Sequence, residues 1–366
     1  MPIPLWDYRK EYEEEREDLL AGVDKVLRSG QLILGSSVRA FEEAFARHCG
    51  TAHGVGVNSG TDALFLALRA LGIGPRDEVI TVSNTAIPTI AAIVSTGAIP
   101  RFVDIDPRTY LMDIAELEGA LGPRTRAIVP VHLFGQCADM RGIGRFAAAH
   151  GLVVVEDCAQ AHGATQHGRH AGSMSEAAAF SFYPTKVLGA FGDAGMVLTA
   201  RADIADRVRR LRVYGTEGTY YAHEHGFNSR LDELQAELLL RKLARLEGYV
   251  ARRRALAARY DRALGAAGLI LPATHPGNAH TYYRYVVRHP RRDAIVRKLE
   301  ERAIAAPAAY PWPVHEMKAY AEYARPLPRT ESAAREIFSL PLYPTLAEAD
   351  QDFVCAALLD ALRHET

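Results

Sequence analysis

The sequence of 366 residues has only four cysteines, and no two of them form a CxxC pair, which argues against a disulfide scaffold. No uninterrupted apolar stretch approaches the roughly 18–20 residues that cross a bilayer. The N-terminus also lacks the basic-then-apolar order of a signal peptide. With 43 basic and 44 acidic side chains, the formal net charge of -1 gives no general reason to bind nucleic acid or an anionic membrane. We therefore start from a soluble, cytoplasmic enzyme.

Two common nucleotide motifs and a metal motif are also missing. No GxxxxGK[ST] occurs, which disfavours a P-loop nucleotidase. Gly54, Gly56 and Gly60 resemble a loosened dinucleotide fingerprint, but the spacing is not GxGxxG and the first two glycines fall inside a β run. The HGRH segment at 167–170 has neither carboxylate nor cysteine partners at metal spacing, so we expect no metal site.

What the chain does contain is a repeated alternation of apolar β runs and helix-like stretches between residues 54 and 200. This alternation predicts an α/β fold with a mostly parallel sheet, and fully apolar runs such as 152–155 suit strands buried on both faces. Leucine spacing predicts one long helix over 230–264. We expect a large domain at residues 1–240 and a smaller C-terminal α/β domain at 241–366, hinged by that helix.

Three segments carry candidate chemistry. NSGTD at 58–62 ends a β run and begins a helix, which favours a phosphate-binding turn, although an ordinary helix cap is the commoner explanation of such a segment. Asp157 follows the buried strand at 152–155 and should lie at the carboxyl edge of the sheet. Lys186 lies in an apolar and aromatic neighbourhood, where desolvation frees an amine to attack carbonyls.

In this order, the three segments match the requirements of pyridoxal 5'-phosphate. The lysine holds the aldehyde, the acid pairs with the pyridinium nitrogen, and the turn binds the phosphate. Each segment alone has a simpler explanation, as a surface lysine, a turn-capping aspartate or a helix cap. Their conjunction favours a cofactor site.

The sequence resembles the DegT/DnrJ/EryC1/StrS family of sugar aminotransferases over nearly its whole length. The motifs that carry the resemblance are NSGTDAL (58–64), VHLFGQCADM (131–140), VEDCAQAHGA (155–164), FSFYPTKVLGAFGDAG (180–195), FNSRLDELQA (227–236) and YPWPVHEMKAY (310–320). The resemblance implies the aspartate aminotransferase-like architecture, fold type I. That fold has a mostly parallel sheet in a three-layer large domain, together with a smaller C-terminal α/β domain.

The resemblance also implies residue roles. Lys186 would bind the cofactor aldehyde and move the proton in the 1,3-shift, Asp157 would pair with the pyridinium nitrogen, and Gln160 would contact the ring hydroxyl. The remaining roles fall on three groups: Gly60, Thr61 and Ser181 at the phosphate; Asn228 at the phosphate of the neighbouring subunit, hence a homodimer with shared sites; and Tyr183, Arg230, Tyr310 and His315 on the substrate side.

Two positions bear on the chemistry. Family members often stack an aromatic residue on the cofactor ring where this chain has Ala86, so that face must be covered differently. Related sugar dehydratases carry histidine in place of the lysine, so Lys186 favours transamination over C–O cleavage.

The expected reaction moves an amino group from L-glutamate to a nucleotide-linked keto-sugar in amino-sugar biosynthesis, such as that of antibiotics. HLFGQCADM and FYPTK resemble the branch of the family that acts on 3-keto sugars, and this resemblance favours a dTDP-3-keto-6-deoxyhexose or its 4,6-dideoxy relative. A 4-keto nucleotide sugar and a keto-inositol remain open. An NAD(P)-dependent sugar oxidoreductase would give Lys186 and Ser181 no joint role, and a non-catalytic regulator would bind the cofactor without a half-reaction with glutamate.

Overall fold

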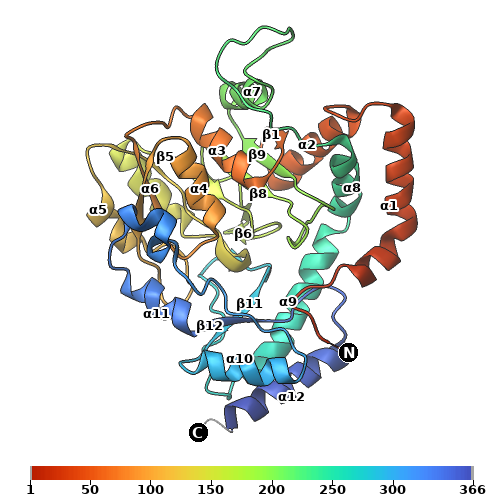
Figure 1. Ribbon diagram of the computed structural model, residues 1–366, viewed down its shortest axis with the longest axis vertical. Helices are drawn as coiled ribbons and strands as arrows, with labels where there is room; N and C mark the ends of the chain where they lie inside the picture. The colour runs from red at the N-terminus through yellow and green to blue at the C-terminus, as the bar shows by residue number, and fades with distance from the viewer. Residues whose placement is uncertain (1, 364–366) are drawn as a thin grey trace.

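The computed structural model describes residues 2–363 and centres on a seven-stranded sheet of order β1-β9-β8-β5-β4-β2-β3 (Figure 1). Its strands are β1 (His53–Val57), β2 (Glu78–Val82), β3 (Ile99–Val103), β4 (Thr125–Ile128), β5 (Val153–Asp157), β8 (Ala177–Ser181) and β9 (Gly195–Thr199). All neighbours from β8 to β3 pair in parallel, and β9 is antiparallel to both β1 and β8. The predicted, mostly parallel sheet is therefore confirmed.

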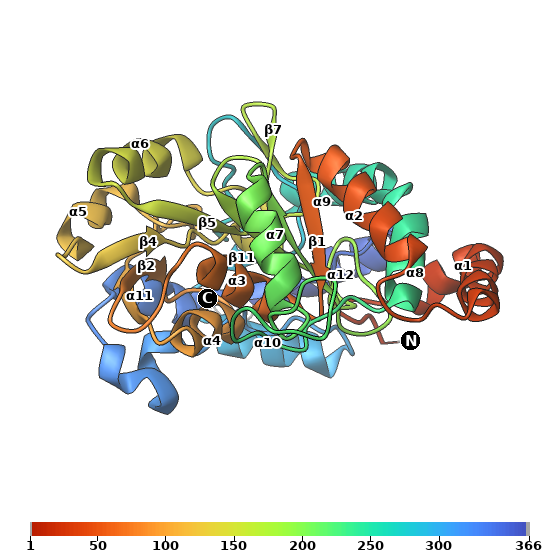
Figure 2. The same ribbon diagram turned by 90° about the horizontal axis from the view of Figure 1, so that it is seen from above.

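Helices cover both faces of this sheet (Figures 1 and 2). One layer contains α3 (Gly60–Ala70), α4 (Ile87–Ser95) and α7 (Ala202–Leu211), and the other contains α2 (Ser36–Cys49), α6 (Met140–His150) and α8 (Glu233–Leu243). Successive residues of a strand point to opposite faces. Accordingly, Ala179 of β8 packs in the core beneath α3, whereas Phe180 packs against α2. Burial on both faces explains why β8 and β9 are almost entirely apolar.

The C-terminal part has its own core beneath the sheet in Figure 1. It contains α9 (Leu246–Leu264), β11 (Tyr285–Arg288), α10 (Arg292–Glu301), α11 (Pro328–Glu336), β12 (Ile337–Leu340) and α12 (Glu348–Arg363). Strands β11 and β12 pair antiparallel. Ile3, from the start of the chain, belongs to this core and pairs with Ile304. The division of the chain after residue 240 stays a prediction.

The long helix predicted over 230–264 is wrong in one respect, because α8 ends at Leu243 and α9 begins at Leu246. Arg245 explains the break: its guanidinium bonds the Arg241 carbonyl at the end of α8 (3.0 Å) and the Asp18 carboxylate of α1 (2.6 Å). Helix α1 (Arg9–Ser29) lies along α8 at the outer edge of the molecule (Figure 1).

Short elements complete the chain: α5 (Leu117–Ala120), a three-stranded sheet of β6 (Thr165–Gln166), β7 (Arg169–His170) and β10 (Asn278–Ala279), and the 3-10 turns Ile114–Glu116, Leu133–Gly135, Val314–Glu316 and Lys318–Tyr323. Among the described helices, none combines the length and the apolar character needed to cross a membrane.

Candidate active site

A cavity of about 270 Å³ lies at the carboxyl ends of β5 and β8 and at the beginning of α3. It gathers most of the residues singled out from the sequence: Gly60, Thr61, Asp157, Gln160, Ser181, Tyr183 and Lys186. Ligand sites of open α/β sheets lie at this edge, where the strands end and the helices begin. The position predicted for Asp157 from the apolar run before it is the position that the structure gives it.

Asp157 ends β5 and is almost completely buried, at 7% exposure. Its Oδ2 accepts a hydrogen bond from the Thr89 hydroxyl (2.8 Å), and its Oδ1 accepts one from the Ala159 backbone N–H (3.1 Å). The Thr85 hydroxyl lies 2.8 Å from that of Thr89 and extends the chain of hydrogen bonds. A carboxylate has about four lone-pair sites, so these bonds orient Asp157 and leave it acceptor capacity toward the cavity. Neither threonine was anticipated from the sequence.

The beginning of α3 provides the anion-binding side of the cavity. Ser59 caps the helix by accepting the Asp62 N–H (3.1 Å), so the cap expected as the commoner explanation is present. The cap satisfies only one of the first N–H groups of the helix, and those of Gly60 and Thr61 come before it. A Cβ on Gly60 would lie 2.4 Å from Cβ of Ser181, so only glycine allows α3 and the end of β8 to approach this closely.

Lys186 is half-buried and approaches an aromatic ring from the C-terminal part. Its Nζ lies 4.8 Å from the centre of the Tyr283 ring, within cation–π range. The Tyr283 hydroxyl lies 3.2 Å from that of Thr185, and the Arg284 guanidinium lies 5.6 Å from the same ring centre. Burial raises the pKa of the Tyr283 phenol, but the charges of Lys186 and Arg284 outweigh this effect and lower it to about 8. The sequence reasoning missed Tyr283.

Gln160 connects the cavity to two aromatic residues. Its Oε1 accepts the Phe134 N–H (2.9 Å), and its Nε2 donates to the Tyr310 hydroxyl (2.7 Å). The rings of Phe134 and Tyr310 stack with centres 6.0 Å apart. Burial raises the pKa of the Tyr310 phenol to about 12, so this hydroxyl stays protonated near neutral pH. Tyr310 thus stands behind Gln160 rather than on the cavity wall.

Three further residues from the sequence analysis are not among the described residues that line this cavity: Asn228, Arg230 and His315. Asn228 is exposed on the segment that pairs with Val213. His315 is buried, its Nδ1 lies 2.7 Å from the Ser83 hydroxyl, and its Nε2 lies 3.5 Å from Glu331. It therefore ties the segment after Tyr310 to the end of β2.

The wall expected to carry an aromatic ring is built from small residues. Ala86 lines the cavity together with Thr85 and Pro88 at the beginning of α4. Asp193 also faces the cavity and was not anticipated. The part of the cavity wall at Ala86 therefore carries no aromatic ring among its described lining residues.

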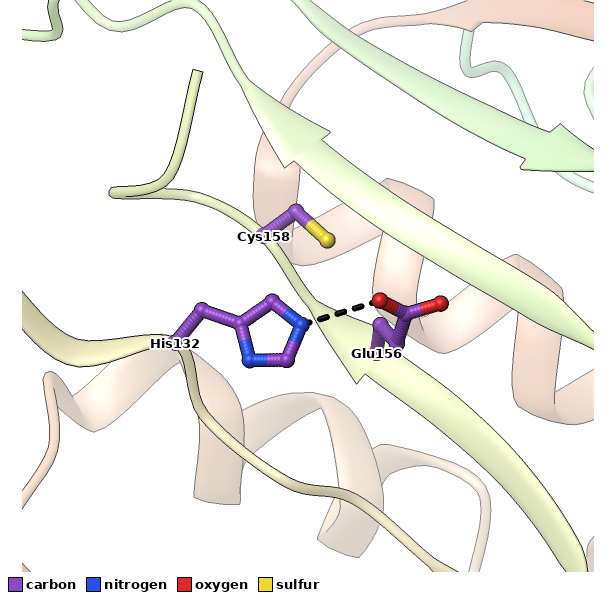
Figure 3. Close-up of side chains that lie close together, drawn as sticks. All are labelled: His132, Glu156 and Cys158. Atoms are coloured by element: carbon purple, nitrogen blue, oxygen red, sulfur yellow. Dashed lines mark hydrogen bonds and ion pairs between the residues drawn. The ribbon is translucent and has the colours of Figure 1, made fainter. Parts of the chain in front are cut away.

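Figure 3 shows a buried cluster of His132, Glu156 and Cys158, whose ligand atoms lie close enough together to hold a metal ion. Hydrogen bonds already occupy it. Glu156 accepts from His132 Nε2 (2.9 Å), from two backbone N–H groups and from a hydroxyl of segment 172–175. Since His132 Nδ1 accepts the Ala138 N–H, Nε2 carries the proton and the ring is neutral. Burial raises the pKa of Cys158 well above its ordinary value, so the thiol stays protonated. The cluster therefore ties the segment 172–175, which precedes β8, to β5.

A second group of described residues with metal-ligand geometry contains His315, Glu316 and Glu331. His315 is already engaged through Ser83, and Glu331 accepts the Leu327 N–H (2.8 Å) at the start of α11. The HGRH residues belong to neither group: His167 and Gly168 lie between β6 and β7, and Arg169 and His170 form β7.

With the fold and the cavity established, comparison with known proteins places the chain among aminotransferases. The model of the DegT/DnrJ/EryC1/StrS aminotransferase family matches residues 13–359. The chain is 54% identical over 371 positions, 99% of both proteins, to a dTDP-3-amino-3,4,6-trideoxy-alpha-D-glucose transaminase of Micromonospora megalomicea subsp. nigra. The protein belongs to the DegT/DnrJ/EryC1/StrS aminotransferase family, as the motifs in its sequence predicted.

Solved structures agree with this assignment. The fold matches that of S. venezuelae DesV in complex with a ketimine intermediate, with a TM-score of 0.97 and 45% identity over 99% of this chain and 98% of that one. It also matches ntda from Bacillus subtilis with bound cofactor PMP, with a TM-score of 0.90 and 31% identity over 96% of this chain and 82% of that one. The fold class implied by the resemblance is confirmed.

Proposed function

We propose that this aminotransferase uses pyridoxal 5'-phosphate to move the amino group of L-glutamate to a dTDP-3-keto-6-deoxyhexose or its 4,6-dideoxy relative. The observation that carries the proposal is the cavity in which Lys186, the buried Asp157 and the beginning of α3 face one another. Similarity over the whole chain to a transaminase of a dTDP-3-amino trideoxy sugar supports the choice of sugar.

The donor set of the cavity fits this cofactor. A phosphate would lie at the N–H groups of Gly60 and Thr61, with the Ser181 hydroxyl beside them. Gln160 and Asp157 would face the ring hydroxyl and the ring nitrogen. Lys186 would hold the aldehyde. When bound, the cofactor supplies an electron sink for the carbon that loses a proton.

The residues around the cofactor would divide the remaining work. Lys186 would remove the proton from the α-carbon of glutamate and, in the second half-reaction, move a proton at the sugar carbon that receives nitrogen. Asp157 would hold the proton of the ring nitrogen, because its carboxylate is fixed by Thr89 and Ala159. Tyr183, which is half exposed at the mouth of the cavity, would contact the sugar.

The proposal includes a homodimer with shared sites. Asn228 is exposed in the single chain and does not face the cavity of its own subunit, which suits a residue that reaches the phosphate of a neighbouring one. Arg230, Tyr310 and His315 are proposed on the substrate side. Tyr310 is hydrogen-bonded to Gln160, which lines the cavity, and His315 is hydrogen-bonded to Ser83 after β2.

An absorbance spectrum of the purified protein, before and after L-glutamate is added, tests the proposal. We expect a band at the edge of the visible range that moves into the near ultraviolet with glutamate and returns when a dTDP-3-keto sugar is supplied. The Lys186→Ala variant should bind the cofactor non-covalently and give no such change. If the band returns only with a 4-keto sugar or a keto-inositol, that compound is the amino acceptor in place of the dTDP-3-keto sugar. A cofactor band that ignores glutamate would indicate a regulator, and no band at all would favour an oxidoreductase.

A further inference from the structure

Tyr283 stands out because the C-terminal part brings it to the candidate catalytic lysine. Its side chain is 8% exposed, and the Lys186 amine faces its ring rather than a carboxylate. The segment that carries Tyr283 immediately precedes β11, far from β5 and β8 in the sequence. The contact therefore joins the smaller core of the chain to the cavity in the larger one.

The backbone at Tyr283 is fixed from two sides. The buried guanidinium of Arg253 donates to the carbonyls of Tyr282 (3.2 Å), Tyr283 (3.4 Å) and Leu342 (2.9 Å). On the other side, Gly135 packs so closely that a Cβ there would lie 2.8 Å from the Tyr283 nitrogen. Gly135 has φ +109°, a conformation that side chains rarely adopt. These contacts hold the backbone that carries the buried Tyr283 ring.

The groups that face the ring are mostly cationic or neutral. Lys186 and Arg284 lie over it, the Thr185 hydroxyl meets its oxygen, and the neutral phenol of Tyr310 lies near enough to affect its charge. The buried Arg253 adds a further positive charge behind it. This surplus of positive charge agrees with the lowered pKa of the Tyr283 phenol.

We propose that Tyr283 is a positioning residue that holds the Lys186 amine on its ring face whenever this amine is not bonded to the cofactor. An aromatic face attracts a cation without accepting its proton, whereas a carboxylate at the same place would compete for that proton. The ring thus keeps the amine beside the cavity and leaves its proton available for the substrate carbon. The inference rests on the proposed function, because transamination leaves the lysine unbonded to the cofactor between its two half-reactions.

The equilibrium of the glutamate half-reaction measures this contact directly. The lysine-bonded protein and glutamate stand on one side, and the amine form of the cofactor, free Lys186 and 2-oxoglutarate stand on the other. Nitrogen passes from glutamate to the cofactor, and the oxygen of water ends in 2-oxoglutarate. The ring should stabilise only the second side. At a fixed ratio of glutamate to 2-oxoglutarate, the absorbance band reports the populations of the two forms without any sugar turnover.

We expect Tyr283→Leu to favour the lysine-bonded form by roughly 3- to 30-fold, the range of a partly desolvated cation–π contact. Tyr283→Phe keeps the ring and should stay within about twofold of the parent protein at pH 7. The matched control is Tyr282→Leu, since the described ring contacts of Tyr282 are with His280 (centres 4.1 Å apart) and Tyr285 (6.2 Å). This control should also leave the equilibrium within about twofold.

Three results would overturn the inference. The first is a shift in Tyr283→Leu no larger than in the control, and the second is an equal shift in Tyr283→Phe, which would assign the effect to the hydroxyl. If the leucine variant does not fold, the phenylalanine variant still decides, because a loss beyond twofold there contradicts a ring-face contact. The third is a parent protein whose band ignores glutamate. That result is recognised before any variant is made, and it removes the proposed function together with this inference.

Discussion

The Thr89 hydroxyl donates a hydrogen bond of 2.8 Å to Oδ2 of Asp157, the carboxylate at the end of β5. Thr89 lies in the first turn of α4, which follows β2, so the bond joins α4 to the end of β5 although β4 separates β2 from β5 in the sheet. Because the hydroxyl donates this hydrogen bond to the carboxylate, it orients Asp157 and fixes the direction of the free lone pairs. We therefore regard Thr89 as part of the site, although no sequence motif pointed to it.

Replacing Thr89 with Val removes this hydrogen bond and nearly preserves the volume of the side chain. A hydrogen bond to a charged group contributes about 1.5–3 kcal/mol, so we expect the glutamate-dependent loss of the absorbance band to slow by roughly 10- to 100-fold. Stopped-flow absorbance gives this rate. Thr96→Val is the control, because the Thr96 hydroxyl donates to the Ile93 carbonyl (2.7 Å) and accepts the Ala98 N–H (3.2 Å) at the far end of the same helix. Equal rates in the two variants would contradict the role of Thr89.

Replacing Asp157 with Asn keeps the shape of the side chain and removes its charge. The cofactor should stay bound, because Lys186 and the residues proposed to bind the phosphate are unchanged. Proton removal from glutamate should slow by roughly 100-fold or more. Absorbance of the purified variant checks binding, and the rate of band loss checks chemistry. Unchanged kinetics would mean that another group protonates the ring nitrogen.

A methyl group at position 60 should separate α3 from β8. In Gly60→Ala the new Cβ would lie 2.4 Å from Cβ of Ser181, so the helix or the strand must move. Forced overpacking typically costs about 1–3 kcal/mol, and we expect cofactor affinity to fall by roughly tenfold or more because both phosphate elements shift. Gly119→Ala is the control, since its Cβ would meet nothing within 4 Å. Fluorescence titration with pyridoxal phosphate compares the two; equal affinity would argue against a phosphate at Gly60.

Shared sites predict recovery of activity on mixing. Asn228→Ala should weaken cofactor retention, and Lys186→Ala should abolish turnover. A mixed dimer would contain one site with both defects and one intact site, so activity should rise above that of either variant after the two are unfolded and refolded together. The same treatment of each variant alone is the control. No recovery in the mixture, with the dimers shown to have exchanged, would speak against Asn228 acting across subunits.

The sequence predicted what depends on local patterns and on motifs. Apolar runs predicted the buried strands, and the strand before Asp157 predicted where this carboxylate lies. Contacts between segments that lie far apart in the sequence could not be predicted from local sequence patterns. The break at Arg245 depends on its bond to Asp18, and the approach of Tyr283 to Lys186 depends on how the C-terminal core docks. Such contacts follow from packing of whole elements, which periodicity and spacing do not encode.

The lowered pKa of the Tyr283 phenol predicts a change in tyrosinate absorbance with pH. Its pKa of about 8 lies below the ordinary value of about 10 because Lys186 and Arg284 lie over the ring. The folded protein should therefore lose this proton before the unfolded chain does. The difference in tyrosinate absorbance between the parent protein and Tyr283→Phe, both in the glutamate-treated form, should rise with a midpoint near pH 8. A midpoint at or above the ordinary value would contradict the charge environment described for the ring.

The lowered pKa of Tyr283 also determines whether its contribution to the free energy of unfolding rises or falls with pH. Between pH 8 and the ordinary tyrosine pKa of about 10, the unfolded chain binds a proton at Tyr283 that the folded protein does not, so the stabilisation that Tyr283 contributes grows as pH rises and is lost as pH falls. Urea unfolding should therefore give a free-energy difference between the parent protein and Tyr283→Phe that grows by about 1–3 kcal/mol from pH 7.5 to about 10. Other tyrosines, whose pKa values are raised by burial, affect both proteins equally and cancel in the difference. A difference independent of pH would mean that the phenol keeps its proton beside the lysine.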